Sequence, residues 1–238
     1  MKVTVVIPAY NEEAGIGLTL DTIPTAALNE AGFEVEKLVV DNASNDRTAE
    51  VAMEHGARVV YQPKKGYGNA YQCGFSNATG DIIACGDADL TYPFEALPQI
   101  LRNMQEQDID FMNTNRLKHL RKGVMHTSHI FGNYLLSFIM RILFNTPFKD
   151  SQSGMWIFKR AVWQYLNVEH TGMPFSQEIK IEAYIKGFRC GEVAIDYRSR
   201  VGQGKLSVVD AYRTMYELFR KRFAIKKELL GLTTEEVE

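Results

Sequence analysis

Short β-branched segments alternate with helical segments along the first half of the chain, and this alternation constrains the fold more than any other feature. Strands are predicted over 3–10, 34–44, 57–62, 81–89 and 109–115. Helical patterns occupy 12–31 (which Pro24 must interrupt), 45–56, 70–80 and 94–107. Strands joined by helices pair in parallel through right-handed crossovers. We therefore expect an α/β fold around a Rossmann-like, mostly parallel, doubly wound sheet.

The second half of the chain is basic, and helix dominates its predicted structure. Residues 1–110 contain 7 Lys/Arg and 17 Asp/Glu, whereas 111–238 contain 20 and 12. One predicted helix, 130–144, is apolar on most sides, and another, 208–227, has an apolar face flanked by Arg and Lys. The predicted organisation is an α/β domain over 1–207, followed by an amphipathic helix and tail over 208–238.

Length and composition suit one large domain, with 45% hydrophobic residues in a chain of 238. The three cysteines lie far apart and predict neither a disulfide framework nor a zinc site, which favours a reducing compartment. The chain opens on a strand rather than a signal peptide, and no apolar run approaches the roughly 20 residues of a spanning helix. We expect a cytoplasmic location and no nucleic-acid partner, and we leave the oligomeric state open.

Polar motifs follow three of the predicted strands at the point where each strand ends. They are "PAYNEE" after the first strand, "DNASND" after the second and "GDAD" after the fourth. Ligands of doubly wound sheets bind beyond the carboxyl ends of the strands. The sequence therefore predicts one binding site at this edge.

Two carboxylates, Asp87 and Asp89, stand on either side of Ala88 at the end of the fourth strand. Carboxylates this close need a cation, or one of them must hold a proton. Mg²⁺ or Mn²⁺ would satisfy both, because such ions take oxygen ligands and share them with phosphates. The chain has no Gly-x-x-x-x-Gly-Lys-[Ser/Thr] loop. Metal and basic side chains would then have to hold a diphosphate.

Six motifs carry a resemblance to a known family. In order they are "VVIPAYNEE", "VVDNASNDRT", "GYGNAYQCGF", "GDADLTYP", "DSQSGM" and "RVGQGKLS". Over roughly residues 2–206 the chain resembles family-2 glycosyltransferases with the GT-A fold, and among them the dolichyl-phosphate mannose and glucose synthases. The resemblance implies inverting transfer of a hexose from a nucleotide sugar, UDP-glucose or GDP-mannose, to a polyprenyl phosphate.

The resemblance also implies a donor site. The residues it places against the nucleotide sugar are Pro8, Tyr10, Asn11, Glu12, Asp41, Gly66, Asp87, Ala88 and Arg200. Asp41 would accept a hydrogen bond from the base, although a turn-forming or helix-capping role is the plain alternative. Gly66 and Gly68 would let the backbone pass close to the ribose, or simply form a turn. Asp87 and Asp89 would bind the metal.

The resemblance further implies catalytic and acceptor residues. Arg116 would contact phosphate, and Asp150 and Ser153 would lie beside the reacting centre. Arg116, His129 and Ser153 form the expected acceptor-phosphate site, although relatives often carry Arg where this chain has His129. Mannose synthases typically have Leu-Gln after the acidic pair, whereas this chain has Leu90-Thr91.

A basic loop and a glutamate complete the expected catalytic set. Arg200 and Lys205 would close over the departing diphosphate, where negative charge builds up. Asp150 or Glu178 would serve as general base for a hydroxyl acceptor. Glu182, one helical turn beyond Glu178, is expected to be solvated.

Several functional alternatives remain open from the sequence. A phosphate acceptor suits the stretch 111–148, which contains basic residues and no acidic ones. The same fold acting on a soluble saccharide or phosphoglycerate hydroxyl is the second hypothesis, and a nucleotidyltransferase or a non-catalytic nucleotide-sugar binding module are less favoured. The helices at 130–144 and 208–227 are expected to rest on the cytoplasmic face of a membrane, or else to cover the core or a dimer contact.

Overall fold

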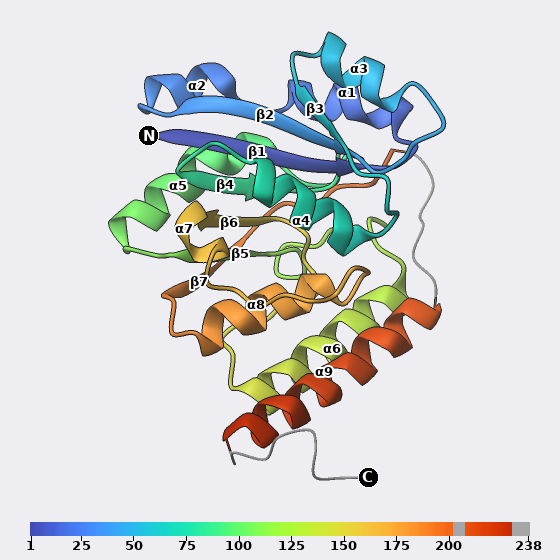
Figure 1. The fold of residues 1–238 in the computed structure, drawn as a ribbon, viewed down its shortest axis with the longest axis vertical. Helices are drawn as coiled ribbons and strands as arrows, with labels where there is room; N and C mark the ends of the chain where they lie inside the picture. Colours follow the sequence, from blue (N-terminus) through green and yellow to red (C-terminus); the bar gives the residue numbers. More distant parts are fainter. Residues whose placement is uncertain (202–207, 230–238) are drawn as a thin grey trace.

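The computed structural model describes residues 1–201 and 208–229. Within these residues the strands form a single sheet in the order β3-β2-β1-β4-β6-β5-β7 (Figure 1). The strands are β1 (Lys2–Ala9), β2 (Glu34–Asp41), β3 (Arg58–Tyr61), β4 (Ile82–Cys85), β5 (Phe111–Asn115), β6 (Trp156–Lys159) and β7 (Cys190–Ala194). The helices are α1 (Glu13–Asp21), α2 (Thr25–Glu30), α3 (Thr48–Glu54), α4 (Tyr67–Asn77), η1 (Phe94–Ala96), α5 (Leu97–Glu106), α6 (Thr127–Phe144), α7 (Arg160–Trp163), α8 (Phe175–Ile185) and α9 (Val208–Leu229).

The sheet is mostly parallel, as the alternating pattern predicts. β1 is parallel to β2 and β4, and β3 extends the sheet in parallel from β2. β6 is antiparallel to both of its neighbours, β4 and β5, while β7 is parallel to β5. The two antiparallel steps through β6 restore the direction of the chain, so β1, β2, β4 and β5 all end at the same edge.

Apolar side chains are buried on both faces of the sheet. In β1, Val3, Val5 and Ile7 belong to the core cluster that includes α1 and α5. Val6 belongs to the cluster that includes α4 and α8. Successive residues of a strand point to opposite faces, so a strand covered on both sides carries apolar side chains at successive positions, as Val5, Val6 and Ile7 do. The β-branched character of the first strand segment follows from this double burial.

Element boundaries differ from the sequence predictions at several points. The helix predicted over 12–31 divides into α1 and α2 at Pro24, as expected. The helix predicted over 70–80 begins earlier, at Tyr67, because the backbone of Gly66 turns sharply at φ 144°. The strand predicted over 81–89 ends at Cys85. The acidic motif is therefore a loop rather than the end of the strand.

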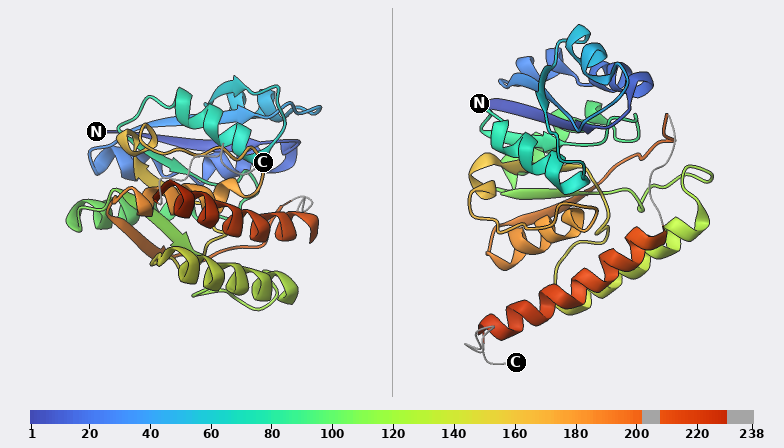
Figure 2. Two further views of the ribbon diagram at one scale, coloured as in Figure 1. Left: turned by 60° about the horizontal axis from the view of Figure 1, so that its bottom comes forward. Right: turned by 45° about the vertical axis from the view of Figure 1, so that its right-hand side comes forward.

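Helices α6 and α9 lie side by side at the end of the molecule opposite β3 (Figures 1 and 2). Leu218 of α9 is fully buried, whereas Phe131, Phe138, Tyr212 and Phe223 are more than two-fifths exposed. No helix in the described part of the chain is long and apolar enough to cross a membrane. Helix α9 packs on α6. The predicted domain boundary at residue 207 remains a prediction.

Two helical glycines allow a matched test of packing between α4 and the sheet. A methyl group at Gly74 would lie 2.4 Å from Cγ1 of Val6, whereas one at Gly132 of α6 meets nothing within 4 Å. Ala is favoured over Gly inside a helix by about 1 kcal/mol. Gly132→Ala should therefore stabilise the protein by about that amount. Gly74→Ala should destabilise it by roughly 1–3 kcal/mol through overpacking.

Urea unfolding of both variants beside the parent protein measures the two changes in the free energy of unfolding. Equal effects of the two substitutions would contradict the close packing of α4 on β1.

Candidate functional site

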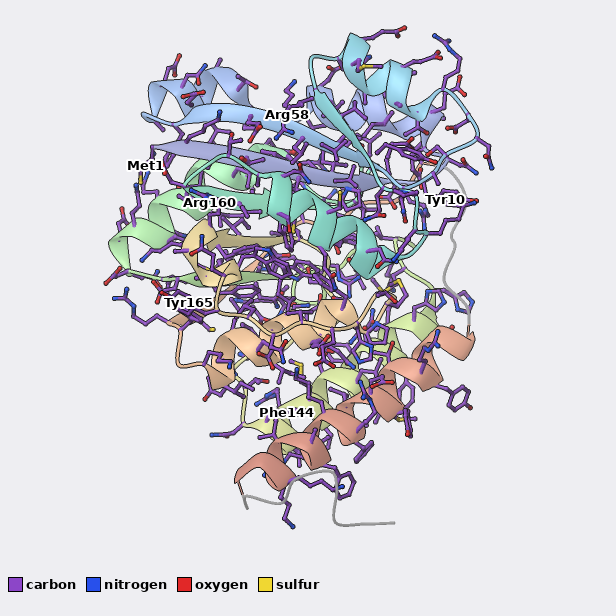
Figure 3. The ribbon with its side chains drawn as sticks, viewed as in Figure 1. Met1, Tyr10, Arg58, Phe144, Arg160 and Tyr165 are labelled. Atoms are coloured by element: carbon purple, nitrogen blue, oxygen red, sulfur yellow. The ribbon has the colours of Figure 1, made fainter. Side chains whose placement is uncertain are left out.

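The polar motifs gather at one edge of the sheet, where β1, β2 and β4 end. Tyr10, labelled in Figure 3, lies at this edge, while Met1 lies at the opposite one. The prediction of a single site at the carboxyl ends of the strands is therefore consistent with the fold.

The loops after β1 and β2 are tied to each other. Asn11 adopts a left-handed backbone conformation with φ 51°. Its N–H donates to Oγ of Ser44 at 3.0 Å, and its Oδ1 accepts from the N–H of Asn45 at 2.8 Å. The N–H of Glu12 donates to Oγ1 of Thr48 at 2.9 Å. The "PAYNEE" and "DNASND" motifs therefore form one folded unit, and Asn11 has a structural role within it.

The other residues expected around the nucleotide lie close to this unit. Pro8 is half-buried at the end of β1. The Lys65 ammonium donates to the hydroxyl of Tyr10 at 2.8 Å and lies 4.3 Å from its ring centroid. Asp41 is 7% exposed, and its Oδ1 accepts from the N–H of Ser44 at 3.1 Å. The turn-forming role of Asp41 is thus observed, while its contact with a base stays a prediction.

Gly66 and Gly68 are glycines because another part of the chain passes against them. A methyl group at Gly66 would lie 2.5 Å from the carbonyl oxygen of Thr171, and one at Gly68 would lie 2.2 Å from that of His170. The N–H of Gly66 also donates to Oδ1 of Asn42 at 2.9 Å. Close packing against 170–171 explains both residues without a ribose, whose contact remains a prediction.

Asp87 and Asp89 differ in their surroundings. Asp89 is 4% exposed; its Oδ1 accepts from the hydroxyl of Thr91 at 2.5 Å, and its Oδ2 lies 3.0 Å from Nη2 of Arg200. Burial, followed by the negative charge of Asp89, raises the pKa of Asp87 to about 7, although Arg116 and Arg200 act in the opposite direction. A carboxylate whose charged form is disfavoured in this way takes up a proton or a cation more readily than an exposed one.

Helix α1 packs against the acidic loop. A methyl group at Gly15 would lie 2.8 Å from the carbonyl oxygen of Ala88, which is 3% exposed. Leu90 has a positive φ of 66°, and its N–H donates to Oγ1 of Thr19 at 3.1 Å. The N–H and hydroxyl of Thr91 both donate to Oδ1 of Asp89. Ala88 is therefore buried packing within the loop.

Three tyrosines surround Asp87, and the sequence analysis missed all of them. The hydroxyl of Tyr71 donates to the carbonyl of Gly154 at 3.2 Å and lies 3.4 Å from Oδ1 of Asp87. The hydroxyl of Tyr92 accepts from the N–H of Gly154 at 2.6 Å. A methyl group at Gly154 would lie 2.7 Å from the hydroxyl of Tyr67 and 3.3 Å from Asp87.

Burial raises the pKa of each of these tyrosines well above its ordinary value, so all three are neutral hydroxyl groups. The four-residue spacing of Tyr67 and Tyr71 on α4 was the available signal. Because the helix was predicted to begin at residue 70, Tyr67 lay outside it and the spacing was not recognised.

Arg116 and Asp150 form a buried two-pronged ion pair. Nε and Nη2 of Arg116 donate to the two carboxylate oxygens at 2.8 and 2.9 Å, and the N–H of Arg116 adds a third bond at 2.9 Å. Burial alone would raise the pKa of Asp150, but Arg116 holds it below its ordinary value. Both oxygens of Asp150 are engaged by Arg116. The expected role of Asp150 as general base would require one of these bonds to be given up, and it remains a prediction.

Lys180 is a further charged residue in the same region, and it was not singled out from the sequence. Its side chain is fully buried, and Nζ donates to the carbonyls of Ser151 and Ser153 at 2.6 and 2.7 Å. Burial lowers its pKa to about 7. The hydroxyl of Ser153 lies 2.7 Å from that of Thr114 and is also fully buried. Ser153 thus faces the core, which argues against its predicted contact with acceptor phosphate.

The remaining predicted residues have varied positions. His129 is exposed near the start of α6. Glu178 and Glu182 are each 4% exposed and lie 2.9 and 2.6 Å from Nζ of Lys221. The prediction that Glu182 is solvated is wrong, because α9 supplies a cation that the sequence of α8 does not show. Lys205 lies outside the described residues.

Comparisons with known proteins identify the family and the fold of the chain. The model of the family described as glycosyl transferase family 2 matches residues 4–166. Over 213 residues the chain is 38% identical to low-salt glycan biosynthesis hexosyltransferase Agl6 of Haloferax volcanii, covering 88% of this chain and 51% of that protein. It therefore spans about half the length of that relative.

Two further proteins extend the comparison. A dolichyl-phosphate hexose transferase of Haloferax volcanii is 31% identical over 203 residues, with 85% of each chain covered. Glucosyl-3-phosphoglycerate synthase from Mycobacterium tuberculosis, solved with Mn²⁺, uridine diphosphate and phosphoglyceric acid, superposes with a TM-score of 0.71 at 22% identity, covering 93% of this chain and 78% of that one. The chain therefore belongs to glycosyl transferase family 2 and has the GT-A fold.

Proposed function

We propose that the protein transfers a hexose from a nucleotide sugar to a polyprenyl phosphate, with inversion at the anomeric carbon. The observation that carries the proposal is the pair Asp87 and Asp89, whose negative charge collects at the ligand-binding edge of the sheet. Family membership makes a glycosyl donor the matching ligand. A relative named dolichyl-phosphate hexose transferase, at 31% identity, supports the acceptor.

A divalent cation, Mg²⁺ or Mn²⁺, fits this carboxylate pair. Asp89 is oriented by Thr91, and Asp87 has a pKa raised to about 7, so a cation would relieve the repulsion between them. Among the described residues no group of three or more His, Cys, Asp or Glu side chains could hold a metal ion. Mg²⁺ is commonly held by one or two carboxylates together with water and phosphate oxygens. When bound, the ion would supply Lewis-acid stabilisation of the leaving diphosphate.

Side chains of the described site would act on charge and position rather than on proton transfer. The acceptor oxygen attacks the anomeric carbon from the face opposite the leaving nucleotide. A phosphate acceptor is already anionic near neutral pH and needs no general base. This fits a site in which Asp150 is engaged by Arg116, and Glu178 by Lys221. Arg200, whose Nη2 lies 3.0 Å from Oδ2 of Asp89, would compensate charge on the diphosphate.

The acceptor would approach from the membrane over α6 and α9. Exposed Phe131, Phe138 and Ile142 of α6 and Tyr216 and Phe223 of α9 offer an apolar surface. Basic residues over 111–148 and on α9 complement anionic headgroups. We propose peripheral attachment to the cytoplasmic face of a membrane, which would leave the polyprenyl chain in lipid while its phosphate enters the site.

A soluble phosphoglycerate hydroxyl is the second candidate acceptor. The glucosyl-3-phosphoglycerate synthase that shares the fold was solved with phosphoglyceric acid. At 22% identity this neighbour supports the fold and leaves the acceptor open. No specific observation favours a nucleotidyltransferase or a non-catalytic module.

Phase partition of the product tests the proposed reaction. With labelled UDP-glucose or GDP-mannose, Mn²⁺ and a polyprenyl phosphate, label should enter the organic phase. Asp89→Asn should lower this transfer by roughly 100-fold or more, because charge stabilisation at the leaving group is lost. Asp21→Asn, on exposed α1 surface, is the matched control and should retain activity. Label that stays in the aqueous phase, and rises on addition of phosphoglycerate, would favour the second candidate.

Metal binding should weaken as the pH falls through the pKa of Asp87, about 7. Below that pH Asp87 holds a proton, which competes with the cation for the same oxygens. Between about pH 8 and about pH 6 the Kd for Mn²⁺ should rise about tenfold.

Electron paramagnetic resonance of free Mn²⁺ measures this change in the Kd. Asp87→Asn should bind Mn²⁺ weakly and lose the pH dependence. An affinity that stays constant over the range would contradict a pKa near 7 for Asp87, and parent-like Mn²⁺ affinity in Asp87→Asn would rule out Asp87 as a metal ligand.

Flotation with liposomes tests the membrane surface. Ile142→Glu combined with Phe223→Glu removes one exposed apolar side chain from each helix, each 66% exposed in the parent protein. Because burial of such a side chain is worth up to about 1.5–3 kcal/mol, binding to vesicles with anionic lipid should fall at least tenfold.

Leu18→Glu changes a residue of α1 that is 53% exposed, and it should float like the parent protein. Parent protein that remains at the bottom of the gradient at low salt would contradict membrane attachment.

A further inference from the structure

A buried ion cluster joins α9 to α8. Nζ of Lys221 lies 2.9 Å from Oε1 of Glu178 and 2.6 Å from Oε1 of Glu182. The two glutamate side chains are 5% exposed and that of Lys221 is 15% exposed. Residues four apart share one face of a helix, so the two carboxylates would repel each other without a cation between them. We call these three residues the clasp.

The second oxygen of each clasp glutamate holds the loop that precedes α8. Oε2 of Glu178 accepts from the N–H groups of Glu169 and His170 at 3.1 and 2.9 Å. Oε2 of Glu182 accepts from the N–H of Asn167 at 3.1 Å. The same carboxylates therefore bind α9 on one side and segment 167–171 on the other.

Segment 167–171 in turn supports the start of α4. The carbonyl oxygens of His170 and Thr171 pack where Gly68 and Gly66 leave room. The N–H of Asn69 donates to the carbonyl of Thr171 at 3.1 Å. One turn further along α4, the hydroxyl of Tyr71 reaches Asp87. Contacts thus run without a break from α9 to the acidic pair.

Other contacts at this junction show that α9 is seated specifically. Nε2 of Gln177 donates to the carbonyl of Thr214 at 2.6 Å, and both residues are 2% exposed. Nε2 of His170 lies 3.0 Å from Oε2 of Glu217. A buried polar group without a partner destabilises the fold. A helix that merely covered apolar surface would therefore not bring buried polar groups to this junction.

We propose that Glu178, Glu182 and Lys221 are positioning residues through which α9 sets segment 167–171 and the start of α4 for donor binding. Glu178 then contributes by holding two backbone N–H groups, in place of its predicted role as general base. The link to the donor rests on the proposed function. The mechanical link among α9, 167–171 and α4 stands apart from it.

Hydrogen exchange of Lys221→Met tests the mechanical link. Loss of the Lys221 ammonium leaves two buried carboxylates without a positive charge between them. The backbone amides of segments 167–171 and 66–71 should then exchange about tenfold faster through local opening. Lys226→Met, an exposed lysine on the same helix, is the matched control and should exchange like the parent protein. Faster exchange confined to α9 would overturn the proposal.

Charge exchange provides the rescue. The double substitution E182K/K221E keeps one cation between two carboxylates and leaves Glu178 on the N–H groups of Glu169 and His170. It removes the acceptor of the Asn167 N–H, so exchange at 66–71 should return part of the way towards the parent rate. If Lys221→Met does not fold, Glu182→Gln keeps the Lys221–Glu178 pair and should speed the same segments to a smaller extent. Failure of the rescue, or parent rates in Glu182→Gln, would contradict the role of the clasp.

Kinetics separate this inference from the proposed function. In Lys221→Met the KM for the nucleotide sugar should rise about tenfold while kcat changes less, since a positioning defect weakens donor binding. The rescue variant should restore part of the change in KM. An unchanged KM with faster exchange would confine the clasp to a structural role. If the parent protein transfers no hexose, the proposed function fails, and hydrogen exchange still decides the mechanical link.

Discussion

Repulsion between the carboxylates of Asp87 and Asp89 is the constraint around which the site is built. Asp89 is tied down by Thr91 and paired with Arg200, while Asp87 has a pKa raised to about 7 by burial and by its neighbour. Arg116 also offsets their charge, yet Arg116 is itself committed to Asp150. The arrangement favours positive charge at the sheet edge, which a divalent cation would supply, and such a cation would also bind the oxygens of a diphosphate.

The loop that carries this pair depends on close backbone packing from three directions. Gly15 of α1 lets the helix approach the carbonyl of Ala88, and Gly154 allows Tyr67 to approach Asp87 from the other side. Nζ of Lys180 donates to the carbonyls of Ser151 and Ser153 and so positions the segment before Gly154. The position of Asp87 therefore depends on packing groups around the loop. Substitutions at these groups should shift Asp87.

The sequence predicted much of the fold and of the site's position. Alternating strands and helices imply a parallel sheet, and the ends of its strands imply the site, because both follow from local patterns and general rules of connection. The roles of individual residues remain predictions. Asp150, Ser153 and Glu178 were assigned to catalysis or acceptor binding, yet each is buried and has a partner elsewhere in the fold. Their partners lie tens of residues away in the chain.

By itself the sequence determined the order of the strands along the chain, the motifs at their ends and the acidic pair, since each depends on neighbouring residues. Only the tertiary structure decided which charged side chains are buried and what compensates them. Glu182 illustrates the difference: on α8 alone it is one helical turn from another glutamate, and only the docking of α9 brings Lys221 to it. Burial and pairing are set by contacts between distant segments, so no local pattern can specify them.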